Sequence, residues 1–151
     1  GIYGTNKEFM VELEGDSGNK LKITPYHPVF SSTFLHNKWM FPFDISPSRP
    51  KEIYCKDMFT FVVQNRKPVV IEDYVFATYG HHLKGDVIEH DYFGTENVIN
   101  DLKQFDTYQF GYVHLKKNMF VKNYGKVTNI ISEYYPSFKT NIVELMMHAN
   151  L

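Results

Sequence analysis

The most informative stretch of this sequence is Leu21-Lys22-Ile23-Thr24-Pro25-Tyr26-His27-Pro28-Val29-Phe30. Its first four residues suit an extended strand, in which successive side chains point to opposite faces. Pro25 and Pro28 hold the backbone near a φ of about −65° and keep it out of a helix. The strand therefore ends in a stiff turn that presents His27 three residues after Thr24.

Thr24 and His27 form a pair of side chains that can do chemistry. An imidazole with an unperturbed pKa of about 6.5 can accept or donate a proton at neutral pH, and a neighbouring hydroxyl can orient the group on which it acts. The same spacing also occurs at ordinary strand ends that carry a solvated histidine. The pair alone leaves both interpretations open.

The composition indicates a mainly β protein of one domain, or of one domain with a small appendage. The 151 residues include thirteen Phe and eleven Tyr but only one Trp. Aromatic and β-branched residues favour strands, and here they fall in short runs separated by Gly, Pro, Asn or Asp. A chain of this length can bury a substantial core.

Charge and cysteine content exclude several function classes. Sixteen basic residues balance seventeen acidic ones, so no strong field attracts nucleic acid or an anionic membrane. No apolar run approaches the length of about 20 residues that crosses a bilayer. A single cysteine permits no intrachain disulfide, which favours a cytoplasmic setting. Because the first residue is Gly rather than Met, we expect a fragment or a processed chain.

Alternating apolar residues and turn signals predict the order of the elements. The sequence predicts strands at 8–14, 21–24, two within 30–44, then 53–63, 68–77, 110–115 and 119–131, the last with a turn at 123–125. Residues 96–105 have an N-cap and apolar spacings of three and four, which predict a helix. A last amphipathic segment at 138–149 is also predicted to be helical.

Four segments in order carry a resemblance to a known family: Thr24-Pro25-Tyr26-His27-Pro28-Val29, Trp39-Met40-Phe41-Pro42-Phe43-Asp44-Ile45, Val75-Phe76-Ala77-Thr78-Tyr79-Gly80-His81 and His90-Asp91-Tyr92-Phe93-Gly94-Thr95. With these segments the chain resembles a Hint (hedgehog/intein) domain. More narrowly, it is similar to the Vint type, which occurs next to von Willebrand factor A domains in eukaryotes. The resemblance spans about residues 8–105 and implies a Hint fold.

The family implies self-cleavage at the N-terminal junction through a thioester or ester. A Cys or Ser attacks the preceding carbonyl carbon, and the histidine of the Thr-x-x-His segment protonates the departing amide nitrogen. Transferred to this sequence, His27 is the proton donor and Thr24 orients it. Asp44 is a candidate second acid or base, although it could equally cap a turn. His81 is expected to pack against the active site.

The chain also departs from the family pattern. It has no Cys or Ser at its start, and the block that carries the nucleophile does not fit into the 23 residues before Thr24. Cys55 lies mid-chain and is interpreted as a packed thiol. We therefore expect a Hint core at 1–82 that lacks its first strands and, as given, does not cleave itself. Residues 83–151 would form an α+β accessory subdomain that either gates access to the cleavage site or binds a molecule that does.

The C-terminal end does not predict full splicing. Inteins end in an Asn that follows a His, and His148-Ala149-Asn150 matches this pattern only loosely. The expected substrate is the protein's own N-terminal flanking polypeptide, and N-terminal cleavage is the expected reaction. No cofactor is expected for this chemistry.

Zinc is the alternative cofactor, because His81, His82 and His90 are clustered with three carboxylates. Adjacent strand residues point to opposite faces, so His81 and His82 could share an ion only if a turn intervened. Such a site would suit a small metal-dependent hydrolase that also uses His27.

A third hypothesis is a non-catalytic module in which the C-terminal part captures a small ligand or a protein. Nine aromatic residues could line its pocket or form the core of a small subdomain, and the second interpretation is favoured. These residues are Tyr92, Phe93, Phe105, Tyr108, Phe110, Tyr112, Tyr134, Tyr135 and Phe138.

Overall fold

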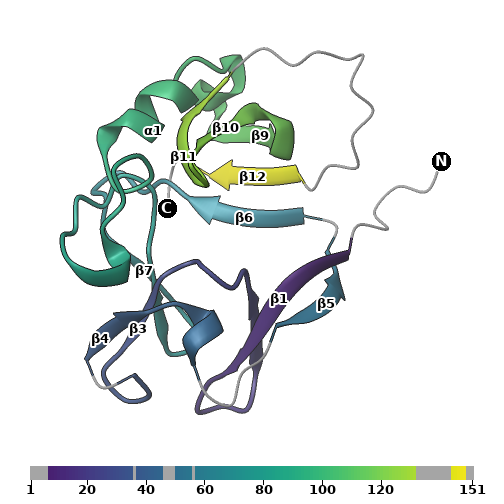
Figure 1. The fold of residues 1–151 in the computed structure, drawn as a ribbon, viewed down its shortest axis with the longest axis vertical. Helices are drawn as coiled ribbons and strands as arrows, with labels where there is room; N and C mark the ends of the chain where they lie inside the picture. The colour runs from purple at the N-terminus through teal and green to yellow at the C-terminus, as the bar shows by residue number, and fades with distance from the viewer. Residues whose placement is uncertain (1–6, 36, 46–49, 56, 132–143, 149–151) are drawn as a thin grey trace.

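The fold is mainly β, as the sequence predicts, and is built from short strands around two hydrophobic clusters (Figure 1). The computed structural model describes residues 7–35, 37–45, 50–55, 57–131 and 144–148. Among the described residues, no helix has the length and apolar character needed to cross a membrane.

The first hairpin forms where the alternation predicts it. β1 (Lys7–Glu14) pairs antiparallel with β2 (Lys20–Ile23) in a register that places Leu13 opposite Leu21. The other edge of β1 pairs with β5 (Lys51–Tyr54), which gives the sheet order β2-β1-β5. Val11 and Leu13 lie two residues apart on β1, so their side chains point to the same face. Both are fully buried in one of the two hydrophobic clusters, which lies in the lower half of the molecule in Figure 1 and is called the lower cluster.

A four-stranded sheet completes the lower half, in the order β4-β3-β8-β7. Its strands are β3 (Val29–Ser31), β4 (Lys38–Met40), β7 (Val69–Ile71) and β8 (Tyr74–Phe76). Here the predicted single strand at 68–77 is wrong, since it is a tight hairpin. Glu72 and Asp73 turn the chain with φ of 49° and 70°, a left-handed conformation that Asp tolerates better than most residues do. The predicted strand at 53–63 is likewise divided between β5 and β6 (Asp57–Phe61).

The upper half contains the only α-helix of the described residues, α1 (Glu96–Leu102). Thr95 caps its first turn, where its hydroxyl oxygen accepts from Asn97 N at 3.3 Å. The helix ends three residues earlier than predicted. β9 (Tyr112–Lys116) follows, and β10 (Phe120–Asn123) and β11 (Lys126–Ile130) form the predicted hairpin, which turns at Tyr124 and Gly125.

In the part of the chain that the structure describes, four short 3₁₀ turns connect these elements: η1 (Pro42–Asp44), η2 (Asp86–Ile88), η3 (Asp106–Phe110) and η4 (Lys117–Met119).

The predicted C-terminal helix is wrong for residues 144–148, which form strand β12 (Glu144–His148). β12 lies between β6, to which it is parallel, and β9, to which it is antiparallel. Two flanking strands bond both backbone edges of this segment, and that pairing outweighs its helical apolar spacing. The rest of the predicted helix lies outside the described residues.

The two halves share structure near the predicted boundary at residue 82. β6 comes from the first 82 residues, yet it pairs with β12 in the upper sheet. Val62 likewise packs with Val98, Ile99 and Leu115 in the second hydrophobic cluster, called the upper cluster. The division of the chain at residue 82 stays a prediction.

Candidate active site

The segment that carries His27 is fixed at both ends by backbone hydrogen bonds. His27 N donates to Thr24 O at 3.4 Å, which closes the turn. Phe43 N donates to Pro25 O at 2.9 Å, and Ala77 N donates to Pro28 O at 3.2 Å. The turn therefore lies between η1 and the end of β8.

The His27 ring has one assigned hydrogen bond, between Nε2 and Ala77 O at 2.8 Å. A carbonyl oxygen can only accept, so Nε2 carries the proton and the lone pair of the neutral ring is on Nδ1. Phe76 meets the ring edge-on, with centroids 5.9 Å apart. Burial lowers the pKa of His27 below its ordinary value, and the hydrogen bond to Ala77 only partly offsets this effect.

Thr24 and Asp44 differ in how they are connected to His27. Thr24 is half-buried and is joined to His27 through its backbone carbonyl. Asp44 is exposed at the end of η1, where its N–H donates to Phe41 O at 2.9 Å. In the described part of the chain, no side-chain hydrogen bond or ion pair joins either residue to the His27 ring. Their catalytic roles remain predictions.

His81 lies within electrostatic reach of His27. Burial lowers its pKa most, and the positive charges of His82, His90 and His27 lower the pKa further. His81 Nδ1 accepts from Leu83 N at 2.8 Å, which leaves the ring proton on Nε2. The ring packs tightly on Gly94, where a Cβ would approach His81 Cε1 to 3.0 Å.

The ring nitrogens of the histidine cluster, which could bind a metal ion, are largely engaged in hydrogen bonds. His90 Nδ1 accepts from Tyr92 N at 3.1 Å and from Phe93 N at 3.0 Å, and burial lowers the pKa of His90. His82 is exposed, and its Nε2 lies 3.3 Å from Glu96 Oε2. Within the described ranges, no three His, Cys, Asp or Glu side chains converge as a metal-binding group. Zinc stays a prediction. Because Nδ1 of His81 and Nδ1 of His90 accept hydrogen bonds, the Nε2 atoms of these rings would have to bind the ion.

Cys55 has the environment of a packed thiol. Its Sγ donates to Asp57 O at 3.3 Å, and burial, together with the charges of Glu8 and Asp57, raises its pKa. The thiol is therefore protonated at neutral pH and is a poor nucleophile.

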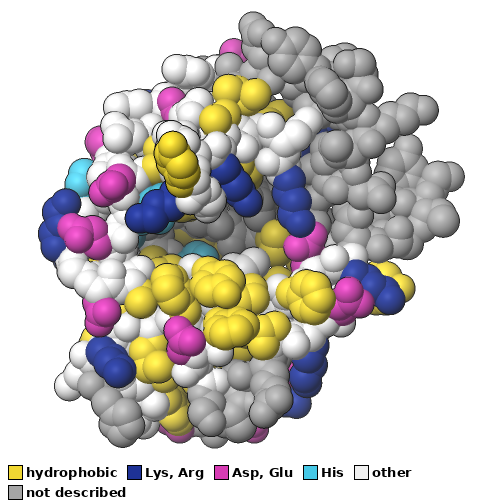
Figure 2. Space-filling view, viewed as in Figure 1, with side chains coloured by type: hydrophobic (Ala, Val, Ile, Leu, Met, Phe, Trp, Pro, Cys, Tyr) yellow, Lys and Arg dark blue, Asp and Glu magenta, His cyan; other side chains and the backbone are white. Residues whose placement is uncertain are grey.

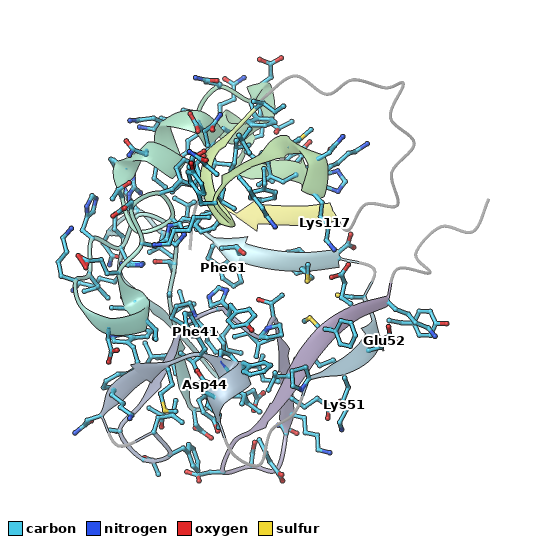
Figure 3. All side chains as sticks on the ribbon, viewed as in Figure 1. Phe41, Asp44, Lys51, Glu52, Phe61 and Lys117 are labelled. Atoms are coloured by element: carbon cyan, nitrogen blue, oxygen red, sulfur yellow. The ribbon has the colours of Figure 1, made fainter. Side chains whose placement is uncertain are left out.

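The surface beside the site is hollowed, and histidine is visible inside the hollow (Figure 2). Hydrophobic side chains line its lower edge in this view. Figure 3 labels Phe41, the residue directly before η1, below Phe61, the last residue of β6. Tyr26 stacks on Phe43 with centroids 5.6 Å apart and meets Phe41 edge-on at 5.4 Å. Tyr26 and Phe43 are 63% and 48% exposed, so this aromatic cluster faces solvent next to His27.

The sequence reasoning did not identify two features near the site. Arg66 forms a bidentate ion pair with Glu96, through NH2 at 2.9 Å and Nε at 3.2 Å. Thr78 is buried and donates to Lys67 O at 3.1 Å. Thr78 belongs to a segment quoted for the family resemblance, which is the only signal that singles it out. Arg66 carries no such signal, because its partner is 30 residues away.

The aromatic residues of the C-terminal part mostly serve the core. Tyr92 is buried in the upper cluster, and Phe93, Phe105 and Tyr108 pack against that cluster. Phe110 is 73% exposed and Tyr112 is 40% exposed. The other three predicted members, Tyr134, Tyr135 and Phe138, lie outside the described residues.

A pocket of about 530 Å³ opens in the upper half, and its lining exposes both polar and apolar atoms. It lies between the segment around η2, the start of α1 and the β10–β11 hairpin. Its lining residues are Asp86, Glu89, His90, Asp91, Tyr92, Asn97, Asn123, Tyr124, Lys126, Val127 and Thr128.

The fold and the Thr-x-x-His turn define a class of protein, the Hint domains. Residues 4–131 match the family Vint, described as a Hint-domain. The chain belongs to this family, as its four segments indicate. No curated protein sequence matches the chain.

Proposed function

We propose that this chain is the acid–base part of an autoprocessing Hint domain that cleaves its N-terminal junction without full splicing. The observation that carries the proposal is the single tautomer of His27. Its Nε2–H is bonded to Ala77 O, so Nδ1 is the atom with a lone pair to accept a proton. The substrate is the protein's own N-terminal flanking polypeptide.

The proposed step is an acyl shift from nitrogen to sulfur or oxygen. The upstream Cys or Ser attacks the carbonyl carbon of the residue before it, and its proton passes to His27 Nδ1. As the C–N bond breaks, the imidazolium returns this proton to the amide nitrogen, which leaves as an amine. The result is a thioester or ester, which a thiol or water then cleaves.

The low pKa of His27 suits both halves of this step. The ring is neutral at neutral pH, so Nδ1 can accept the proton of the nucleophile. Once protonated, a ring whose charged form is destabilised by burial is a stronger acid than free imidazole, so it readily protonates the departing nitrogen. The half-buried Thr24 stabilises the turn through its carbonyl, and a charge on His27 lowers the pKa of His81.

Intact-mass spectrometry of the chain preceded by its own upstream residues tests the proposal. We expect one cleavage at a Cys or Ser junction, accelerated by added thiol and suppressed by His27→Ala. His82→Ala is the matched control, because His82 is exposed and outside the proposed step. Cleavage that His27→Ala leaves unchanged would contradict the proposal. Cleavage that a chelator abolishes would also contradict it and would favour the metal-dependent hydrolase.

The pocket in the upper half supports a second candidate, a non-catalytic module that binds a small ligand or a protein. Its carboxylates, amides and Lys126 offer both donors and acceptors within about 530 Å³. Backbone NMR shifts recorded against a set of small polar compounds test this alternative. Saturable shifts confined to the pocket, with an unchanged protein mass in the extended chain, would favour the binding module.

A further inference from the structure

Thr78 places a hydroxyl in the interior, one residue after the carbonyl that holds His27. Thr78 is 2% exposed, and its Oγ1 lies 3.1 Å from Lys67 O and 3.4 Å from Arg66 O. Both partners are carbonyl oxygens, so the hydroxyl is the donor. A buried hydroxyl is unfavourable unless it is bonded, and an apolar residue of the same size would avoid that cost. Packing alone therefore does not explain a threonine at this position, and its hydrogen bond must contribute.

The turn that accepts from Thr78 is rigidly held. Arg66 has a φ of 62°, a conformation that non-glycine residues rarely adopt. Its NH1 donates to Val63 O at 2.9 Å within the same turn, and its other nitrogens bind the Glu96 carboxylate of α1. The acceptor carbonyls are thus fixed by a strained turn and by an ion pair to a second element.

The backbone on either side of Thr78 is also tied down. Ala77 N donates to Pro28 O at 3.2 Å, and Tyr79 N donates to Phe61 O at 3.0 Å. Between these two bonds lies the Ala77–Thr78 peptide, whose carbonyl oxygen is 2.8 Å from His27 Nε2. The Thr78 hydroxyl ties the residue on the far side of this peptide bond to the 66–67 turn, so it restrains rotation of the peptide plane.

We infer that Thr78 is a positioning residue, whose hydroxyl holds the Ala77 carbonyl in the direction that keeps the proton of His27 on Nε2. The part of the inference that concerns the tautomer of His27 can be tested on this chain alone. Its consequence for cleavage rests on the proposed function, since an Nδ1 lone pair matters only if Nδ1 moves a proton.

The test compares Thr78→Val, which keeps the shape and removes the hydroxyl, with Thr78→Ser, which keeps the hydroxyl. Tyr74→Phe is the matched control, because it removes another buried bond from a side chain to a backbone carbonyl, Tyr74 OH to Glu14 O at 3.2 Å. The readout is the ¹⁵N chemical shifts of His27, which report the ratio of the two neutral tautomers. We expect Thr78→Val to lower the Nε2–H preference by roughly two- to tenfold, the effect of weakening one hydrogen bond. Serine should restore it, and Tyr74→Phe should not change it.

The inference is overturned if Thr78→Val leaves the His27 tautomer as in the unmodified chain, or if Tyr74→Phe shifts it equally. Should Thr78→Val fail to fold, the unmodified chain supplies the test. A slowly exchanging Thr78 hydroxyl proton is expected there, and a rapidly exchanging one contradicts the inference. In the extended chain, slower cleavage by Thr78→Val with serine rescue links the two proposals. A tautomer shift without any change in cleavage rate would count against the proposed function alone.

Discussion

At the scale of the residue, the account depends on a histidine that is held neutral by its surroundings. Burial lowers the pKa of His27, and it is also the largest cause of the lowered pKa of His81 and of His90. Each of these rings prefers its neutral form in the folded protein more than in the unfolded chain. Folding is therefore linked to pH.

The sign of this linkage gives the first prediction. Below an unfolded pKa of about 6.5 the unfolded chain binds protons that the folded protein does not, so stability falls as pH falls. Urea unfolding at several pH values between 8 and 5 measures it. His27→Gln keeps a side-chain N–H for Ala77 O but does not titrate, so the loss of stability on acidification should be smaller. An equally steep loss in His27→Gln would contradict the assignment to His27.

Gly94 gives a second prediction at this scale. A Cβ there would lie 2.7 Å from His90 O and 3.0 Å from His81 Cε1. Because the first contact is with backbone, Gly94→Ala should lower the free energy of unfolding by roughly 1–3 kcal/mol, as overpacking does. Gly125→Ala is the comparison, since its Cβ meets no atom within 4 Å and its cost comes only from a φ of 80°. Equal losses in the two variants would contradict overpacking at Gly94.

The sequence could identify Thr24 and His27, because side chains in a motif are visible in the sequence. The partner of His27 could not be identified in this way. It is the backbone carbonyl of Ala77, 50 residues away, and every residue has a carbonyl. The role of Thr78 depends on that same carbonyl and was missed for the same reason.

At the scale of the element, hairpins with local turn signals were predictable. The β1–β2 and β10–β11 hairpins follow from alternation and from Gly-containing turns. The β7–β8 turn was missed, because Glu72-Asp73 interrupts the apolar run without a Gly or a Pro. β12 was predicted as a helix because its pairing partners, β6 and β9, are distant in sequence.

The N-cap of α1 gives a prediction for this element. The Thr95 hydroxyl accepts from Asn97 N and lies 2.8 Å from Asp91 O. Thr95→Ala should lower the free energy of unfolding by about 1 kcal/mol, within a range of roughly 0.5–2 kcal/mol. Thr128→Ala, at an exposed position of the β10–β11 hairpin, should have a smaller effect in the same chemical denaturation. The reverse order would contradict the capping role.

At the scale of the whole molecule, the chain crosses between two hydrophobic clusters. β6 and Val62 lie in the upper half, whereas the strands before and after them, β5 and β7, belong to the lower half (Figure 1). The Arg66–Glu96 ion pair adds a second connection, though half-exposed pairs of this kind stabilise by only about 0–1 kcal/mol. The pairing of β6 with β12 joins segments distant in sequence and could not be predicted from local patterns.

This arrangement predicts that the two halves unfold together. Leu115 is fully buried in the upper cluster, so Leu115→Ala should cost roughly 2–5 kcal/mol. The single Trp, Trp39, lies on β4 in the lower sheet and reports on the other half. We expect the Trp39 fluorescence transition to shift as far as the circular dichroism transition. An unshifted fluorescence transition would show two independent units and would support a boundary near residue 82.

The central claim is that His27 moves a proton through Nδ1 during N-terminal cleavage. Its most direct test is the cleavage rate of the extended chain, followed by intact mass from pH 8 to pH 5. The account predicts that the rate falls on acidification with a midpoint below about 6.5, as Nδ1 becomes protonated. His27→Ala should slow cleavage at neutral pH by roughly 100-fold or more. Cleavage by His27→Ala at the unmodified rate, with the same pH profile, would contradict the account.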